Sequence, residues 1–323
     1  ERIMNEVTFD DKISRHSTLT FFSFAFYQFP ASLVTTAQTV VLFFFYEAVI
    51  GLNTWLVFLG FTIATIWDAI NDPLLGFLTD RNIRLTKRLG RRFPWILFGV
   101  IPWSFSLLFI YMPPPLDPVS QGWLLTLWLI FALCFFDTFH TLIYVQIVAL
   151  RADKFRTEEE RRRLSQFFVP IDAISSVTGS ILPPLFLGLG EGYEGFAIMA
   201  ILISIITLAS SFIFLPGAKE DGIMIKRYFE QEFKRMGFLT GLKELFKSKA
   251  FIVFLLTFIF FEITMGMLTG NTIYLATFAL RDSDLTTVIL LVFLLAAIIS
   301  VPFWTKLMKR WDDNKKVFQI GGL

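Results

Sequence analysis

The chain has 323 residues, of which 55% are hydrophobic and 17% charged, with 40 phenylalanines and a formal net charge of +2. Soluble domains carry about 25% charged residues, so this composition excludes an ordinary soluble protein. The single cysteine, Cys134, excludes a disulfide framework within the chain, and we expect it to be a small buried hydrophobe.

Eight apolar segments are long enough to cross a bilayer, which takes roughly 20 mostly apolar residues. They cover residues 18–46, 53–79, 94–112, 122–150, 164–189, 194–215, 250–280 and 285–308. A ninth begins near Lys316, which predicts that the chain is part of a longer one. A cleavable signal peptide is not expected, because the first 16 residues are polar and charged.

The positive charges are distributed unevenly between the connections. Of 29 Lys and Arg residues, 28 lie in the N-terminal tail and in residues 81–92, 151–163, 219–249 and 306–316. The alternate connections hold only Arg281. Since cytoplasmic loops carry the excess of Lys and Arg, the pattern predicts a multi-pass protein with a cytoplasmic N-terminus.

A long charged stretch divides the chain in two. Residues 216–249 are amphipathic, and we expect an interfacial helix between Tyr228 and Lys249. The predicted organisation is a six-helix half at 1–215, this cytoplasmic linker, and the start of a second half at 250–323. Two six-helix halves with a central substrate site are the plan of the major facilitator superfamily. The predicted class is therefore all-α and integral to the membrane, with twelve helices in full and eight to nine here.

Basic turns follow the second and eighth segments, at corresponding positions of the two halves. The turn after segment two contains Asp80, Arg81, Arg91 and Arg92. We expect these four residues to form a gating loop that holds one conformer. The alternative is that the charges serve only to set the topology.

Acidic residues occur inside the apolar segments, and no Lys or Arg lies in the interior of any of them. They are Asp68, Asp72, Asp137, Asp172 and Glu262. A carboxylate at the bilayer centre costs at least about 2.5–3.5 kcal/mol and normally faces the bundle interior or water. A proton, a metal cation or a basic group from elsewhere is therefore expected to neutralise them.

The stretch WDAINDP is the most specific of these. Asp68 and Asp72 are four residues apart on one helical face, and Asn71 is three residues from Asp68. Pro73 cannot donate an N–H, which leaves the Ala69 carbonyl free. These oxygens predict a site for Na⁺, Li⁺ or H⁺. The alternative is that Asp72 marks a water-exposed helix end.

The fourth segment, FFDTFHTLIYVQ, brings Asp137, Thr138, His140 and Thr141 into an apolar run. We expect Asp137, His140 and Thr141 to line a substrate cavity, although a lone buried His is more often a packing residue. Asp172, Glu262 and Asn271 are candidates for the same cavity. A helix cap or an interhelical hydrogen bond is the alternative for each.

WDAINDPLLGFLTD followed by GRRFPWILFG resembles the glycoside–pentoside–hexuronide:cation symporters, the family of melibiose permease. ALRADKFRTEEERRRL and GMLTGNTIYLATFALRDSDL are similar to that family's helix 4–5 loop and helix 7. The resemblance implies a twelve-helix symporter that moves a sugar with Na⁺, H⁺ or Li⁺. It also implies a cation site at Asp68, Asn71, Asp72 and Thr138.

The resemblance does not extend to the family's sugar site. The family's helix-1 aspartate corresponds to Ser32, its helix-4 aspartate to Thr141 and its stacking tryptophan to Val145. Its helix-5 arginine falls near Phe167, with Gln166 beside it. A related branch, the sodium-dependent lysophospholipid transporters, also keeps the helix-2 pair without the helix-1 acid.

We therefore predict a cation-coupled transporter that moves a sugar or glycoside by alternating access. The alternative is a sodium-dependent transporter of a lysophospholipid or another amphiphile. The protein is expected to lie in the plasma membrane as a monomer. No enzymatic activity, cofactor or nucleic acid is predicted; the expected partners are the small-molecule substrate, the coupling ion and the lipid bilayer.

Overall fold

The computed structural model describes residues 16–79, 86–186, 193–222, 224–226, 246–282 and 285–311. All regular elements within these ranges are helical. They are α2 (Thr18–Ala25), α3 (Gln28–Phe44), η1 (Phe45–Val49), α4 (Thr54–Thr79), α5 (Thr86–Leu89), α6 (Phe93–Tyr111), α7 (Gly122–Lys154), α8 (Glu158–Phe186), α9 (Glu194–Ala218), α12 (Lys249–Tyr274), η2 (Leu275–Ala279) and α13 (Leu285–Trp311).

Seven helical stretches among the described residues are long and apolar enough to cross a membrane. They match the first seven predicted segments, and α13 occupies the eighth. The predicted all-helical, multi-span class is confirmed. The expected ninth segment and most of the expected interfacial helix lie outside the described residues.

The first predicted segment is interrupted rather than continuous. Helix α2 ends at Ala25, and a turn at Phe26 and Tyr27 leads into α3. Pro30 lies in the first turn of α3, where its ring and missing N–H weaken a continuous hydrogen-bond ladder. The sequence shows the proline, but the pattern of apolar residues runs through the break unchanged.

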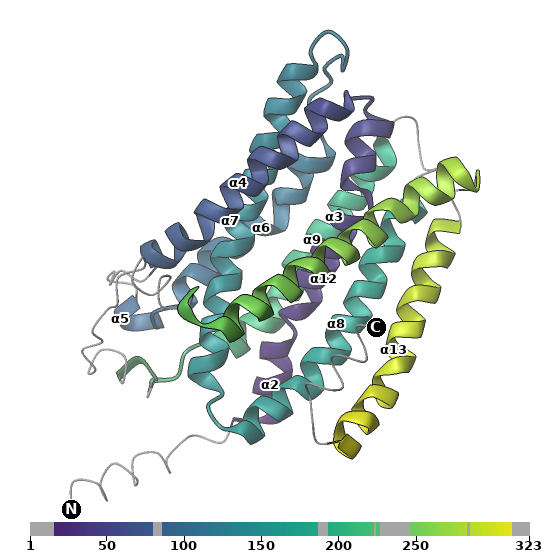
Figure 1. The fold of residues 1–323 in the computed structure, drawn as a ribbon. Helices are drawn as coiled ribbons and strands as arrows, with labels where there is room; N and C mark the ends of the chain where they lie inside the picture. The colour runs from purple at the N-terminus through teal and green to yellow at the C-terminus, as the bar shows by residue number, and fades with distance from the viewer. Residues whose placement is uncertain are drawn as a thin grey trace, which may run out of the picture.

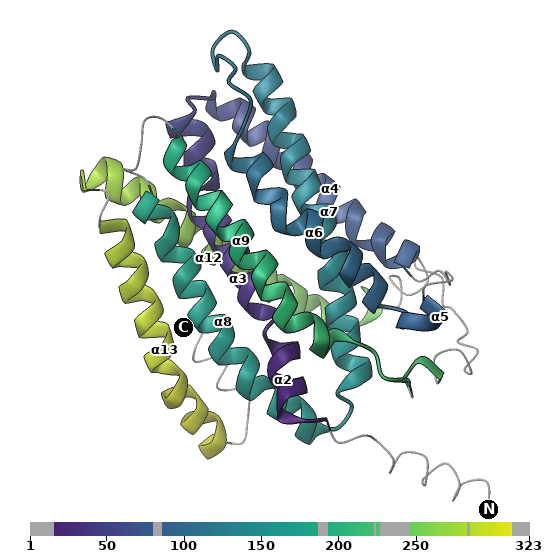
Figure 2. The same cartoon turned by 180° about the vertical axis from the view of Figure 1, so that it is seen from behind.

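The helices form one bundle (Figure 1). Helix α3 packs against α8 and α9, α6 lies between α7 and α9, and α4 runs along α7. Seen from behind, α9 covers α3 (Figure 2). Helix α12 crosses the front face and contacts α3, while α13 packs on α8. The α3–α8 pair therefore meets both long helices that follow residues 216–249.

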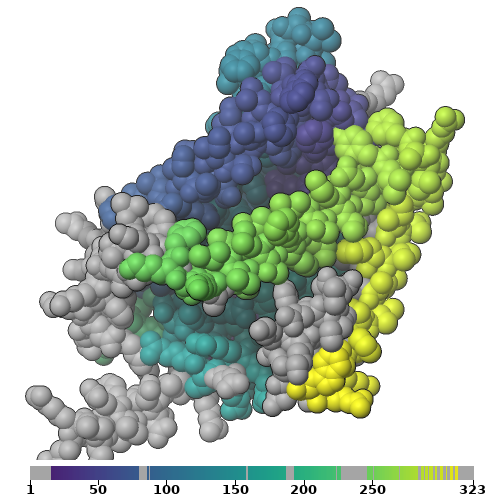
Figure 3. All heavy atoms as spheres, viewed as in Figure 1, coloured from purple at the N-terminus to yellow at the C-terminus, as the bar shows by residue number. Residues whose placement is uncertain are grey.

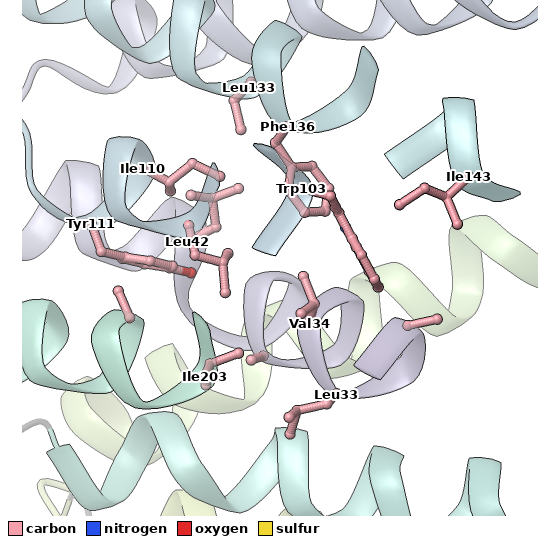
Figure 4. Close-up of a cluster of buried hydrophobic side chains, with 14 of the residues drawn as sticks. Leu33, Val34, Leu42, Trp103, Ile110, Tyr111, Leu133, Phe136, Ile143 and Ile203 are labelled. Atoms are coloured by element: carbon pink, nitrogen blue, oxygen red, sulfur yellow. The ribbon is translucent and has the colours of Figure 1, made fainter. Parts of the chain in front are cut away.

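The apolar core lies between α3, α6, α7 and α9 (Figure 4). Trp103 and Tyr111 of α6, Leu33 of α3 and Ile203 of α9 are all nearly inaccessible to solvent. Burial of large rings stabilises this part of the bundle through dispersion and close packing. It also provides a rigid backing for the polar residues of α3 and α7.

A structural repeat relates α3 to α12. Each helix ends in a π-helical turn, η1 and η2, and the first N–H after each turn bonds a carbonyl five residues back at 2.9 Å. Two residues beyond each turn the backbone is left-handed, at Gly51 (φ 81°) and Arg281 (φ 57°). The same local geometry thus recurs at the ends of the first helices of the two expected halves.

Candidate cation and substrate site

The acidic motif lies on α4, with its members on different sides of the helix. Asn71 is buried, with 1% of its surface exposed, whereas Asp68 and Asp72 are exposed. Pro73 is inside α4 and leaves the Ala69 carbonyl without its usual N–H donor. The motif therefore presents carboxylates outward and an amide toward α7.

Helix α7 meets this motif through polar contacts. The Asn71 amide donates to the Asp137 carboxylate at 3.0 Å. The Trp67 indole N–H donates to the Thr138 hydroxyl at 3.0 Å, and that hydroxyl donates to the Cys134 carbonyl at 2.7 Å. Asp137, which the sequence suggested as part of a substrate cavity, therefore lies with the expected cation-site residues.

Asp137 of α7 meets α4 at Asn71, which lies between Asp68 and Asp72 in the sequence. Among the described residues, no group of three or more His, Cys, Asp or Glu side chains is arranged to hold a metal ion. Three carboxyl groups and one amide thus belong to the contact region between α4 and α7, where a proton or a cation could neutralise them.

A second polar cluster links α3 to α8. The Ser32 hydroxyl donates to Asp172 Oδ1 at 2.5 Å, and the Gln28 amide donates to the same oxygen at 2.8 Å. Gln28 Nε2 also lies 2.8 Å from the Ser32 hydroxyl oxygen. Of the expected substrate-cavity residues, Ser32 and Asp172 are thus brought together, and Gln28 joins them without having been predicted.

The other expected cavity residues are dispersed. His140 stacks between Phe136 and Tyr144 on α7, with ring centroids 5.5 and 5.9 Å away. Asn271 donates at 2.7 Å to the Met267 carbonyl of its own helix. Gln166 on α8 and Glu262 on α12 are exposed.

Of the expected gating loop, Asp80 and Arg81 lie outside the described residues. Arg92 forms an ion pair with Asp153 at the end of α7, at 3.0 Å. Glu220, which was not predicted, accepts the backbone N–H groups of Arg91, Arg92 and Phe93. Its carboxylate thus caps the start of α6, where unpaired N–H groups and the helix dipole favour a negative charge.

A further contact outside the predictions joins α12 to the first helices. The Glu47 carboxylate accepts the Tyr274 hydroxyl at 2.7 Å and the Thr54 hydroxyl at 3.0 Å. Phe44 packs on Tyr274 with ring centroids 5.5 Å apart. The one signal for Glu47 in the sequence is its position as an acidic residue directly after the apolar segment 18–46.

Comparison with known proteins identifies the family. The family described as MFS/sugar transport protein matches residues 23–323. The chain belongs to this MFS/sugar transport family. The predicted superfamily is confirmed, and with it a multi-span membrane protein of a transporter family.

Relatives within the family carry two kinds of name. A sodium-dependent lysophosphatidylcholine symporter of Danio rerio is 23% identical over 284 residues, which cover 78% of this chain and 52% of the relative. An isoprimeverose transporter of Lactiplantibacillus pentosus is 27% identical over 297 residues, covering 88% of this chain and 58% of the relative. An uncharacterised symporter of Synechocystis sp. is 29% identical over 185 residues, covering 54% and 33%. The chain thus spans about half the length of the curated relatives it matches.

Proposed function

We propose that the protein is a cation-coupled secondary transporter that works by alternating access, with Na⁺ or H⁺ as the co-transported ion. The observation that carries the proposal is the hydrogen bond from Asn71 of α4 to Asp137 of α7, which brings a third carboxylate to the motif that contains Asp68 and Asp72. Three carboxylates in membrane-crossing helices are costly unless a cation occupies them in part of the cycle. Relatives named as sodium-dependent symporters support the coupling ion.

The polar contacts between α4 and α7 would couple ion binding to movement of these two helices. In this structure Asn71 joins the two helices through its hydrogen bond to Asp137. Binding of Na⁺ would require the carboxylates of Asp68, Asp72 and Asp137 to turn toward one ion, whereas a proton would neutralise one of them. Each charge that crosses with substrate contributes about 2.3 kcal/mol per 100 mV to accumulation.

Two substrate classes remain candidates. A sugar or glycoside is supported by the family description and the isoprimeverose transporter. A lysophospholipid is supported by the lysophosphatidylcholine symporters. In either case the substrate would bind between a half at 1–215 and a half beginning at 250, joined by residues 216–249. The arrangement would lie in the plasma membrane with the N-terminus in the cytoplasm.

The coupling site is tested by removing one charge at a time. Asp68→Asn and Asp72→Asn should each abolish uptake driven by a Na⁺ or H⁺ gradient in proteoliposomes, because an amide has no negative charge to balance Na⁺ and cannot take up and release a proton. Asp117→Asn is the matched control, since Asp117 is an acid in the connection before α7, bound by Ser120. Full gradient-driven uptake by both α4 variants would reject the assignment.

A further inference from the structure

The carboxylate of Asp172 is only partly satisfied within the protein. Both recorded donors, Gln28 and Ser32, bind the same oxygen, Oδ1. Oδ2 of Asp172 and Oε1 of Gln28 have no hydrogen bond to any described residue, and none of the described ion pairs involves Asp172. The cluster thus holds one carboxylate in a fixed orientation and leaves acceptor oxygens unused.

The depth of the cluster makes this arrangement costly. Asp172 is the ninth residue of the apolar run that begins at Leu164, after the charged residues 158–163, and Ser32 is the fifteenth residue of the 32-residue span Thr18–Val49. Both therefore lie inside membrane-crossing segments, away from the charged ends. An unneutralised carboxylate at that depth is expected only where a ligand or a water-filled path meets it.

The backbone beside the cluster is also irregular. The turn at Phe26 and Tyr27 separates α2 from α3 directly before Gln28. The Ser175 hydroxyl, on the same side of α8 as Asp172, donates to the Phe29 carbonyl within this region. Discontinuous helices are a common component of substrate sites in secondary transporters.

The surrounding elements place the cluster where the expected halves meet. Helix α3 contacts α12 and α8 contacts α13, so both partners of the cluster border helices that follow the linker (Figure 3). In Figure 3, α12 lies as a band across the face of the bundle that is turned to the viewer. A group held between α3 and α8 would be affected by any movement of α12 or α13.

We propose that Asp172, held by Gln28 and Ser32, is the substrate-recognising carboxylate of this transporter and accepts hydrogen bonds from hydroxyl or ammonium N–H groups of the substrate. This inference rests on the proposed transport function. It is independent of the ion site, which lies on α4 and α7.

The chemistry of the cluster sets the class of substrate. Its unused atoms are acceptors, so the matching ligand group is a donor: sugar hydroxyls, or the N–H groups of a primary ammonium. A quaternary ammonium attracts the negative charge but offers no N–H. A site built to bond donors discriminates strongly against an analogue without them, because the acceptors that the bound substrate covers are then left unpaired.

Uptake of three labelled compounds by the protein in proteoliposomes tests the class: isoprimeverose, lysophosphatidylethanolamine and lysophosphatidylcholine. The first has sugar hydroxyls, and the two lysolipids differ in the N–H groups of their heads. The proposal expects uptake of isoprimeverose, or uptake of the ethanolamine lipid at a lower KM than the choline lipid. If isoprimeverose is not transported and the two lysolipids have equal KM values, the proposal is wrong.

Variants of Asp172 then test whether this residue binds the substrate. Asp172→Asn should raise the KM for the accepted compound about 10- to 100-fold, the usual cost of losing a hydrogen bond to a charged group. The concentration of cation giving half-maximal uptake should not change. Ser175→Ala is the matched control, because it removes a different α8-to-α3 hydrogen bond and should leave the KM unaltered.

A charge swap distinguishes recognition from mere support of the fold. Ser32→Asp combined with Asp172→Ser returns a carboxylate to the same contact from the other helix and should recover most of the lost affinity. A KM within twofold of the parent for Asp172→Asn, or no recovery in the swap, overturns the proposal. Absence of gradient-driven uptake of every compound by the parent protein would instead refute the proposed function.

Discussion

At the scale of single residues, the loop before α6 depends on Glu220 and a glycine. Gly90 has φ 96°, and a Cβ at this position would lie 2.4 Å from Cδ of Glu220. The same carboxylate caps three backbone N–H groups at the start of α6. A side chain at residue 90 would therefore strain the backbone and displace the cap at once.

Gly90→Ala should lower the free energy of unfolding by about 1–3 kcal/mol, the cost of a left-handed non-glycine residue. Thermal unfolding in detergent measures the change. Gly222→Ala is the control, since an added Cβ there meets no atom within 4 Å. Equal stability of the two variants would show that the Glu220 cap contributes little.

At the scale of helices, close crossings decide which polar groups meet. Gly179 of α8 sits against α3, where a Cβ would be 2.7 Å from the Leu33 carbonyl oxygen and 3.1 Å from Cβ of Thr36. Small residues at such crossings let membrane helices approach closely. This approach is what allows Asp172 of α8 to reach Ser32 of α3.

Gly179→Ala should separate α3 from α8 and cost about 1–3 kcal/mol through overpacking. In thermal unfolding, Gly266→Ala on α12 should be neutral or stabilising by up to about 1 kcal/mol, because its Cβ would meet no atom within 4 Å. If the Gly179→Ala protein is as stable as the parent, α8 can move away from α3 without lowering the free energy of unfolding, and the prediction is wrong.

At the scale of the whole molecule, the bundle is held together at the end that carries η1 and η2. Tyr274 donates to Glu47 at 2.7 Å, and Phe44 contacts both Tyr274 and Phe278. These contacts join α3 to α12, which alternating access would have to separate. The charge pattern predicts that this end faces the outside, and in that orientation these contacts would close the outer end.

Tyr274→Phe removes the hydrogen bond to Glu47 and should shift the population toward an outward-open state. A thiol introduced by Thr39→Cys, in a Cys134→Ser background, reports this shift by faster reaction with a membrane-impermeant maleimide. Thr39 lies beside Gly270, one turn inward of Tyr274. Thr264→Val, which loses only a bond to its own helix, should leave the rate unchanged. A rate unaffected by Tyr274→Phe would show that this contact does not close the outer end.

The sequence by itself determined the class and the positions of the first seven membrane-crossing segments. Apolar length is a local property, and lipid leaves a polypeptide few ways to satisfy its backbone, so the segments could be read directly and the structure confirms them. The acids of WDAINDP were also evident, because a charge within such a run is costly wherever the helix lies.

Only the tertiary structure decided which polar groups act together. Whether Asp137 meets Asn71, or Asp172 meets Ser32, depends on how neighbouring helices are rotated and how closely they approach. Those quantities are set by packing between segments far apart in the chain, by the break between α2 and α3, and by glycines at crossings. None of them changes the local apolar pattern, which is why the sequence could name the acids but not their partners.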